Sequence, residues 1–248
     1  MRRRSIGVLS VEELFALRLD RVESCSPSAV IEALEAYVGD ERKALLQQVL
    51  AARLGSVSVL FDQPYDPHNG AAVMRSAEAF GIQHLHVLER AGTPFLAANS
   101  VTRGASKWID LHCHGSISEA LAAVRSTGQT LVAAVADGEL EPEALAQVER
   151  VCIVLGNERE GIRPELLACC DRTVRVPMRG FVESLNVSVT GAILMHAATR
   201  GRAGDLSDED RMRVYARGLY FSLRSADKIL DVLGLGPSVS RVPDQRER

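Results

Sequence analysis

The sequence lacks several features that identify whole classes of protein. Aromatic residues make up only 4% of the chain, and no apolar run approaches the length that crosses a bilayer. The basic start, from Met1 to Arg4, has no apolar segment or cleavage site after it, so we do not interpret it as a secretory signal. We therefore expect a cytoplasmic protein.

Cysteine is scarce, and its spacing suits neither a metal centre nor a disulfide framework. None of the cysteines lies in the paired spacing of zinc ligands, and the two that are adjacent in sequence are poor disulfide partners. An odd total is typical of a reducing compartment. The cysteines are Cys25, Cys113, Cys152, Cys169 and Cys170. We expect no metal in the functional site.

Excess positive charge is also missing, since the formal net charge is -3. This balance argues against a protein that holds nucleic acid by its global charge, but it allows a local basic face. The basic residues near the motifs described below are Arg75, Arg90, Arg103, Lys107, Arg159, Arg163, Arg175 and Arg179.

Common catalytic and nucleotide-binding signatures are absent as well. No Ser-His-Asp set, Cys-His set or paired carboxylates are evident, and no G-x-G-x-x-G follows the first predicted strand. The second absence argues against a nucleotide-binding oxidoreductase.

Strand-like and helix-like segments alternate through the middle of the chain. This alternation predicts an α/β fold with a mostly parallel sheet flanked by helices. We expect strands at 57–61, 84–88, 108–111, 131–136, 151–155 and 173–176, and helices at 71–80, 117–126, 142–147 and 165–169.

The two ends of the chain differ from this middle domain, which we place at 55–204. Residues 1–54 form a predicted helical extension, with helices at 11–19, 29–37 and 41–54. Residues 205–234 form a second helical extension, because apolar residues recur at helical spacing between 208 and 233. Residues 235–248 are polar, and we expect them to be disordered.

Two of three polar motifs follow predicted strands. After the first strand, we expect Asn69 to cap a helix that ends at Gly81 and carries Arg75 off the centre of its apolar stripe. After the strand at 151–155, Gly156 and Gly161 bracket a polar loop that contains Glu158. Open α/β sheets bind ligands at the carboxyl ends of their strands, so these loops are candidate site segments.

The third motif alternates small polar and apolar residues from Ser184 to Thr190 before an apolar run at 192–195. The alternation predicts an extended approach to a buried helix. Ser184 and Asn186 lie at that junction, where the unpaired N–H groups of a helix start favour a ligand or an anion.

In order and spacing, these three motifs resemble those of the SpoU branch of the SPOUT RNA methyltransferases. The resemblance runs from about residue 57 to residue 200. His68-Asn69 and the Gly104 to Trp108 segment also resemble the TrmH-type tRNA (guanosine(18)-2'-O)-methyltransferases within that family. The resemblance implies a SPOUT fold with a C-terminal trefoil knot, a homodimer, S-adenosyl-L-methionine as cofactor, and tRNA as the RNA partner.

The resemblance also implies roles for particular residues. Arg75 would act at the ribose 2'-hydroxyl, directly or through an RNA phosphate, because free arginine is always protonated and cannot be an ordinary base. Asn69 would orient Arg75 or the ribose, and Glu158 would pair with one of those two residues. Ser184 and Asn186 would support the site. The cofactor would lie against Ala134, Leu155, Gly156, Val176, Met178 and Leu185.

Two other functions stay open at this point. The RNA substrate could be ribosomal, although the helical leader does not look like the separate α/β RNA-binding domain that many ribosomal enzymes of this family carry. The chain could also be a catalytically silent RNA-binding protein on the same fold.

Overall fold

The computed structural model describes residues 11–95, 102 and 104–237. The chain divides into two compact units, one of residues 51–207 and the other of residues 1–50 together with 208–248. Residues 238–248, which hold most of the tail predicted to be disordered, lie outside the described residues. None of the described helices has the length and apolar character needed to cross a membrane.

The larger unit is built on a six-stranded sheet with the order β3-β2-β1-β5-β4-β6. Every pair of neighbouring strands is parallel. The strands are β1 (Leu54–Asp62), β2 (Ile82–Leu88), β3 (Asp110–His114), β4 (Thr130–Ala134), β5 (Val151–Leu155) and β6 (Arg172–Val174). The predicted parallel α/β fold is thus confirmed, while the knot stays a prediction.

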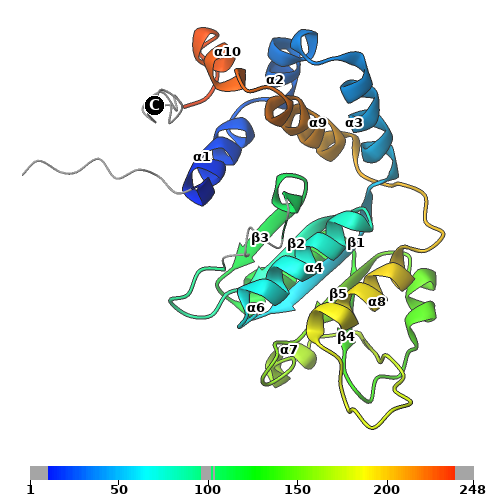
Figure 1. Ribbon diagram of the computed structural model, residues 1–248. Coiled ribbons are helices and arrows are strands. Elements are labelled where there is room, and N and C mark those ends of the chain that lie inside the picture. Colours follow the sequence, from blue (N-terminus) through cyan, green and yellow to red (C-terminus); the bar gives the residue numbers. More distant parts are fainter. Residues whose placement is uncertain (1–10, 96–101, 103, 238–248) are drawn as a thin grey trace, which may run out of the picture. The chain divides into compact units, whose positions relative to one another are not determined.

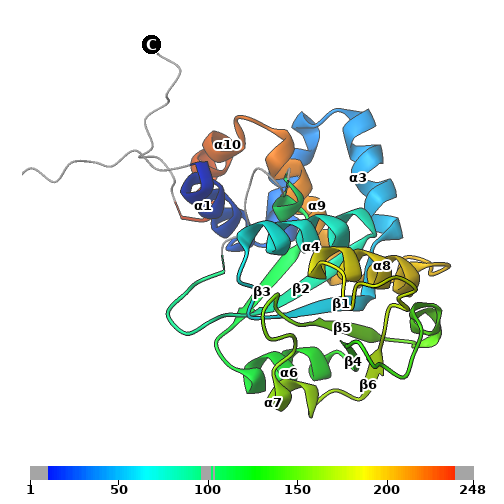
Figure 2. The ribbon, with the colours of Figure 1, turned by 60° about the horizontal axis from the view of Figure 1, so that its bottom comes forward.

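Helices cover both faces of this sheet (Figures 1 and 2). On one face, α4 (Pro67–Ala79) and α8 (Val187–Thr199) pack Val73 and Leu194 into a core with the strand residues Val59 and Ile153. On the other face, α6 (Ile117–Ser126) and α7 (Pro164–Leu167) form a second core. Two 3₁₀ helices, η2 (Ala105–Lys107) and η3 (Pro142–Gln147), complete the unit.

Several predicted boundaries are wrong. Helix α4 starts earlier than expected, because Asp66 rather than Asn69 is its N-cap and accepts a bond from the His68 N–H. Helix α8 already begins at Val187, so the expected extended segment up to Thr190 is half helical. Strand β3 lies at Asp110–His114 instead of 108–111, and residues 142–147 form a 3₁₀ helix.

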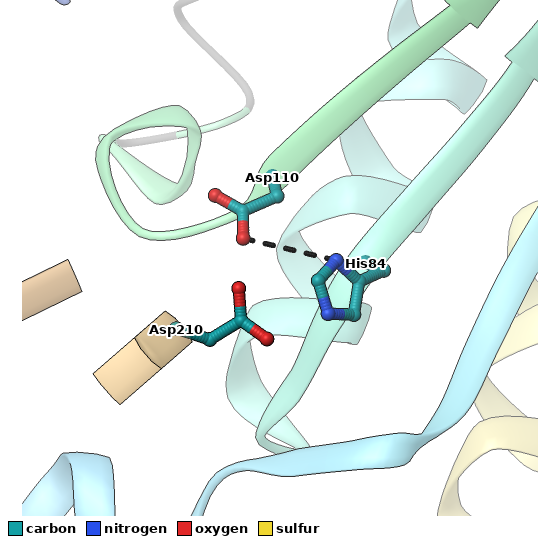
Figure 3. A group of neighbouring side chains, drawn as sticks. All are labelled: His84, Asp110 and Asp210. Atoms are coloured by element: carbon teal, nitrogen blue, oxygen red, sulfur yellow. Dashed lines mark ion pairs between the residues drawn. The ribbon is translucent and has the colours of Figure 1, made fainter. Parts of the chain in front are cut away.

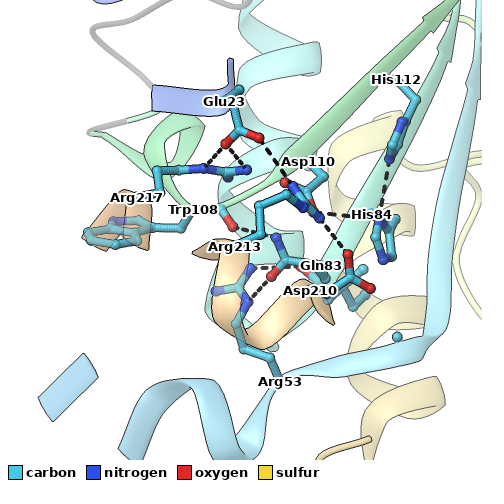
Figure 4. Close-up of polar contacts among 12 residues, drawn as sticks. Glu23, Arg53, Gln83, His84, Trp108, Asp110, His112, Asp210, Arg213 and Arg217 are labelled. Atoms are coloured by element: carbon cyan, nitrogen blue, oxygen red, sulfur yellow. Dashed lines mark hydrogen bonds and ion pairs between the residues drawn. The ribbon is translucent and has the colours of Figure 1, made fainter. Parts of the chain in front are cut away.

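The smaller unit joins the two ends of the sequence. It contains α1 (Val11–Glu23), α2 (Pro27–Leu34), η1 (Glu35–Tyr37), most of α3 (Asp40–Ala52), α9 (Asp208–Ser222) and α10 (Ala226–Val232). Arg217 on α9 donates to Glu23 on α1 at 2.6 Å, a pair that Figure 4 shows. A Cβ at Gly218 would lie 2.7 Å from Leu46, so α9 packs tightly on α3. Helical segments at opposite ends of the sequence therefore form one packed body.

Four of the six histidines gather on one face of β2 and β3. His84 and His112 lie 3.3 Å apart between ring nitrogens, and His86 and His114 lie 3.0 Å apart. The His86 ring also stacks on that of His112. His84 forms an ion pair of 3.7 Å with Asp110, which Figure 3 shows. We call these four residues the histidine stack.

Candidate functional site

A cavity of about 940 Å³ opens at the carboxyl edge of the sheet. Loops that follow β4, β5 and β6 form its wall together with the approach to α8. All six residues predicted to bind the cofactor line it, namely Ala134, Leu155, Gly156, Val176, Met178 and Leu185. The volume lies within the range of small-molecule sites, roughly 300–1,000 Å³.

Two glycines let the loops around this cavity pack against each other. A Cβ at Gly156 would lie 2.2 Å from the backbone carbon of Gly161, and one at Gly138 would lie 2.3 Å from that of Val174. Gly161 itself has a φ of 73°, which favours glycine. Any side chain at Gly156 or Gly138 would push the loops apart, so the cavity depends on these residues.

The polar cluster beside the cavity joins all three sequence motifs. The Asn69 amide Nδ2 donates to Glu158 Oε1 at 2.8 Å. The Asn186 Nδ2 donates to Asn69 Oδ1 at 3.1 Å, while Asn186 Oδ1 accepts from the Ser188 N–H at 2.8 Å as the N-cap of α8. We call Glu158, Asn69 and Asn186 the motif cluster. It connects α4, the loop after β5 and the start of α8.

Glu158 also fixes the loop that follows β1. Its carboxylate accepts the backbone N–H of Tyr65 at 3.0 Å and that of Asp66 at 3.3 Å. Partial burial raises the pKa of Glu158, but the bonds from Asn69, Tyr65 and Asp66 outweigh it and hold this pKa below its usual value. Glu158 is therefore a carboxylate at neutral pH, suited to holding N–H donors.

The loops after β1 and β5 meet between these two neighbouring strands, at the point where the strand order reverses. The connection after β1 leads to α4 on one face, and the connection after β5 leads to α7 on the other. Such a switch point is the usual ligand site of an open parallel sheet. The motif cluster lies at this point.

Asn157 is a site residue for which the sequence motifs imply no role. It is 6% exposed, and its Oδ1 accepts the backbone N–H groups of Arg159 at 3.0 Å and Glu160 at 2.9 Å. Its backbone pairs with that of Gly161, which closes the loop. Asparagine before a turn commonly bonds to the backbone two residues on, and that signal was available in the sequence.

Two predicted residues remain outside the motif cluster. Arg75 is exposed on α4, and its side chain makes no hydrogen bond or ion pair with any described residue. Ser184 lines the cavity, but it too makes no side-chain hydrogen bond among the described residues. Neither Asn69 nor Arg75 lines the cavity. Within one chain, Arg75 is therefore not part of the cavity wall.

Comparison with known proteins identifies the family. The model of the SpoU rRNA Methylase family matches residues 56–196. The tRNA (guanosine(18)-2'-O)-methyltransferase of Escherichia coli (strain K12) is 32% identical over 162 residues, which cover 65% of this chain and 70% of the relative.

Solved structures give the same result. The crystal structure of the A. aeolicus TrmH/SpoU tRNA modifying enzyme matches with a TM-score of 0.66 and 26% identity, over 74% of this chain and 98% of that one. The SpoU methyltransferase AviRb from Streptomyces viridochromogenes, in complex with AdoMet, matches with a TM-score of 0.51 and 25% identity, over 62% of this chain and 60% of that one. The chain belongs to the SpoU rRNA methylase family.

Proposed function

We propose that this protein transfers a methyl group from S-adenosyl-L-methionine to the 2'-hydroxyl of a guanosine ribose in the D-loop of tRNA, at guanosine 18. The observation that carries this proposal is the motif cluster at the edge of the 940 Å³ cavity. The tRNA substrate is supported by the E. coli relative, whose name specifies that reaction.

The cavity suits the proposed cofactor. Its wall combines apolar side chains, among them Met178 and Leu185, with backbone groups of the loops after β4, β5 and β6. Apolar side chains would flank an adenine, and backbone N–H and C=O groups would bind its polar edges. The cofactor supplies an electrophilic methyl group. AviRb, a relative on the same fold, holds AdoMet in its crystal structure.

The chain's own residues would position the RNA and manage the hydroxyl proton. Transfer forms an oxygen–carbon bond and breaks a sulfur–carbon bond, so the 2'-hydroxyl proton must leave. A guanidinium cannot accept it at its ordinary pKa, so either the site lowers the proton affinity of Arg75 or Arg75 anchors an RNA phosphate that accepts the proton. The planar fork of guanidinium suits the second route. Asn69 and Asn186 would hold the ribose beside the cavity.

A homodimer is part of this proposal. Arg75 lies outside the cavity of its own chain, so a second copy that brings its Arg75 to the cavity would complete the site. Twofold pairing would do this for both sites at once. Light scattering at micromolar concentration should give twice the chain mass, and a stable monomer would overturn the dimer.

Co-expression of two inactive variants tests whether the site is shared. Arg75→Ala keeps its cavity, and Leu185→Asp, with a charge in the cavity wall, keeps its arginine. Differently tagged chains purified as a mixed dimer should regain activity if each site takes Arg75 from the other chain. An inactive mixed dimer would place Arg75 and the cavity of one chain in the same site.

Ribosomal RNA is the second candidate substrate, because the matching family model describes rRNA methylases. Bulk tRNA and ribosomal RNA incubated separately with methyl-labelled cofactor separate the two. We expect label in tRNA, at a guanosine ribose of the D-loop. Label in ribosomal RNA alone would overturn the tRNA assignment, and label in neither would overturn the methyltransferase proposal. We place the protein in the cytoplasm, where tRNA is modified and where five free cysteines would stay reduced.

A further inference from the structure

An aromatic ring with two arginines lies next to the motif cluster. Tyr65 follows β1, and the guanidinium carbons of Arg90 and Arg159 lie 4.3 and 4.4 Å from the centre of its ring. Arg90 follows β2 and Arg159 follows β5, so the three residues come from three loops at the same edge of the sheet. We call them the Tyr65 platform.

Each arginine of the platform has a fixed backbone. Arg90 opens a turn in which its carbonyl accepts the Thr93 N–H at 2.9 Å. The N–H of Arg159 donates to Asn157 Oδ1 at 3.0 Å. Stacking on Tyr65 then limits the side chains as well. Holding a charged group in place before binding reduces the entropy that binding would cost.

The guanidinium N–H donors of the platform meet no oxygen acceptor within the described part of the chain. Neither Arg90 nor Arg159 makes a side-chain hydrogen bond or an ion pair with a described residue. A guanidinium carries five N–H donors in its plane, and a cation–π contact supplies none of them with an oxygen acceptor. Acidic neighbours do not take them up: Glu158 accepts from Asn69 and Tyr65, and Glu89 accepts from the Phe95 N–H at 2.7 Å.

We propose that the Tyr65 platform is a phosphate clamp for the RNA backbone next to the target ribose. Two fixed guanidiniums with free donors match phosphate oxygens, which guanidinium binds bidentately. The Tyr65 N–H bonds to Glu158, and Glu158 bonds to Asn69, so the clamp adjoins the motif cluster. This inference rests on the proposed RNA methyltransferase function and adds a binding site to it.

Salt dependence of RNA binding distinguishes a phosphate clamp from arginines that only stiffen loops. Log affinity falls as log salt rises, and each phosphate contact that is lost makes this negative slope shallower by about one. Affinity for unmodified tRNA should be measured by filter binding between 50 and 200 mM salt. Arg90→Ala and Arg159→Ala should each weaken binding about tenfold near 0.1 M salt and make the slope shallower by about one.

Two further variants serve as controls. Arg200→Ala removes an exposed arginine at the far end of α8, whose side chain likewise has no partner among the described residues. It should leave affinity and slope unchanged. Tyr65→Leu removes the ring but keeps both charges and the backbone N–H that Glu158 binds. It should weaken binding about threefold with an unchanged slope, because cation–π contacts are modest and phosphate contacts would remain.

Two results would overturn the clamp: a slope that stays unchanged in both arginine variants, with or without weaker binding, or an equal loss in Arg200→Ala. Methyl transfer to tRNA by the wild type, measured in the same preparations, tests the proposed function separately. If the wild type binds tRNA but does not methylate it, the proposed function fails and the slopes alone decide the clamp. If the wild type binds no RNA, both proposals fail.

Discussion

Two arginines at the amino end of the sheet are used differently from two that follow strands at its carboxyl edge. At the amino end, Arg202 donates to the carbonyls of Ala198 and Glu149 at 2.7 Å, to that of Leu145 at 3.2 Å, and also to Val148 O and Ser56 Oγ. Nearly every donor of this guanidinium is satisfied within the protein. The side chain ties the segment around η3 to the end of α8.

Arg53, directly before β1, shows the same pattern. It is 2% exposed and donates to the Gln83 side chain and to Ile82 O, while Gln83 donates to Trp108 O (Figure 4). Arg75 on α4 and the two arginines of the Tyr65 platform have no such oxygen partners among the described residues. The difference indicates that Arg53 and Arg202 stabilise the fold, whereas Arg75, Arg90 and Arg159 are available to a ligand. Arg163, which also follows β5, instead pairs with the buried Asp62 at 2.7 Å.

Arg75→Ala should show the largest effect and test this division most directly. Methyl transfer at saturating substrates should fall by roughly 10²–10⁴-fold, the usual contribution of a positioned acid–base group. The free energy of unfolding should change by less than about 0.5 kcal/mol, because an exposed side chain without partners is lost. Cofactor affinity, measured by calorimetry, should stay near the wild-type value. Retention of more than about half of the wild-type rate would show that Arg75 does not act in the reaction.

Arg202→Ala should have the reverse effect. It leaves several carbonyl groups without donors, so unfolding in urea should show a loss of about 3 kcal/mol. The rate of methyl transfer per folded molecule should not change. Arg200→Ala, two residues earlier, is the matched control and should cost less than about 0.5 kcal/mol. Equal losses in the two variants would show that the carbonyl contacts of Arg202 do not stabilise the fold.

Local sequence signals predicted some elements well and others poorly. The strand at 151–155 and the helix at 117–126 have the predicted bounds, because a continuous apolar run defines one and Ser116 caps the other. Strand β3 was misplaced because the apolar residues around Trp108 suggested a strand. The strand Asp110–His114 pairs with β2 and makes histidine contacts with it. Such contacts with a distant segment cannot be predicted from local propensity.

Three motif residues that the structure brings together could be named from the sequence, but their arrangement could not. The three motifs pointed to Asn69, Glu158 and Asn186, and these residues are hydrogen bonded to one another. The six cavity residues could be named because the resemblance to the SpoU methyltransferases implied them, and all six line the cavity. The spacing of motifs along the sequence gives no distance between elements in space. It could therefore not show that Arg75 lies outside the cavity wall, or that Arg90 and Arg159 lie over the Tyr65 ring.

One member of the histidine stack, His86, extends the comparison to a buried group that is neutral at pH 7. Burial, and then the imidazoles of His112, His114 and His84, lower the pKa of His86 from 6.5 to about 3. Between pH 6.5 and about 3, His86 therefore binds a proton in the unfolded chain but not in the folded protein. Stability is fully present above pH 6.5 and is lost as the pH falls toward 3.

When the pH is lowered from 7 to 5, protonation of His86 in the unfolded chain should reduce the free energy of unfolding by about 2 kcal/mol. Urea unfolding at the two pH values measures this loss. His86→Phe, which keeps a ring in the stack, should reduce the difference. His196→Gln, at an exposed position on α8, should leave it as in the wild type. An unchanged pH dependence in His86→Phe would exclude the stack as its source.

Glu158→Gln should change stability less than Arg202→Ala does, because its bonds lie at the accessible end of the sheet. The bonds from Asn69 and the loop after β1 lower the pKa of Glu158, so its contribution is present above the ordinary carboxyl pKa and is lost as the pH falls through the folded value. At pH 7 the variant should lose less than about 1 kcal/mol, since solvent weakens exposed charge interactions. Glu160→Gln, whose side chain has no partner among the described residues, should lose nothing measurable.

A double-mutant cycle with Asn69→Ala would assign the loss caused by Glu158→Gln. Coupling between the two changes is expected, because Asn69 Nδ2 donates directly to the Glu158 carboxylate. A loss for Glu158→Gln as large as that for Arg202→Ala would mean that the carboxyl edge is stabilised as firmly as the amino end. In that case the unpaired donors of Arg75, Arg90 and Arg159 would not be enough to identify the carboxyl edge as a ligand-binding region rather than a stabilising one.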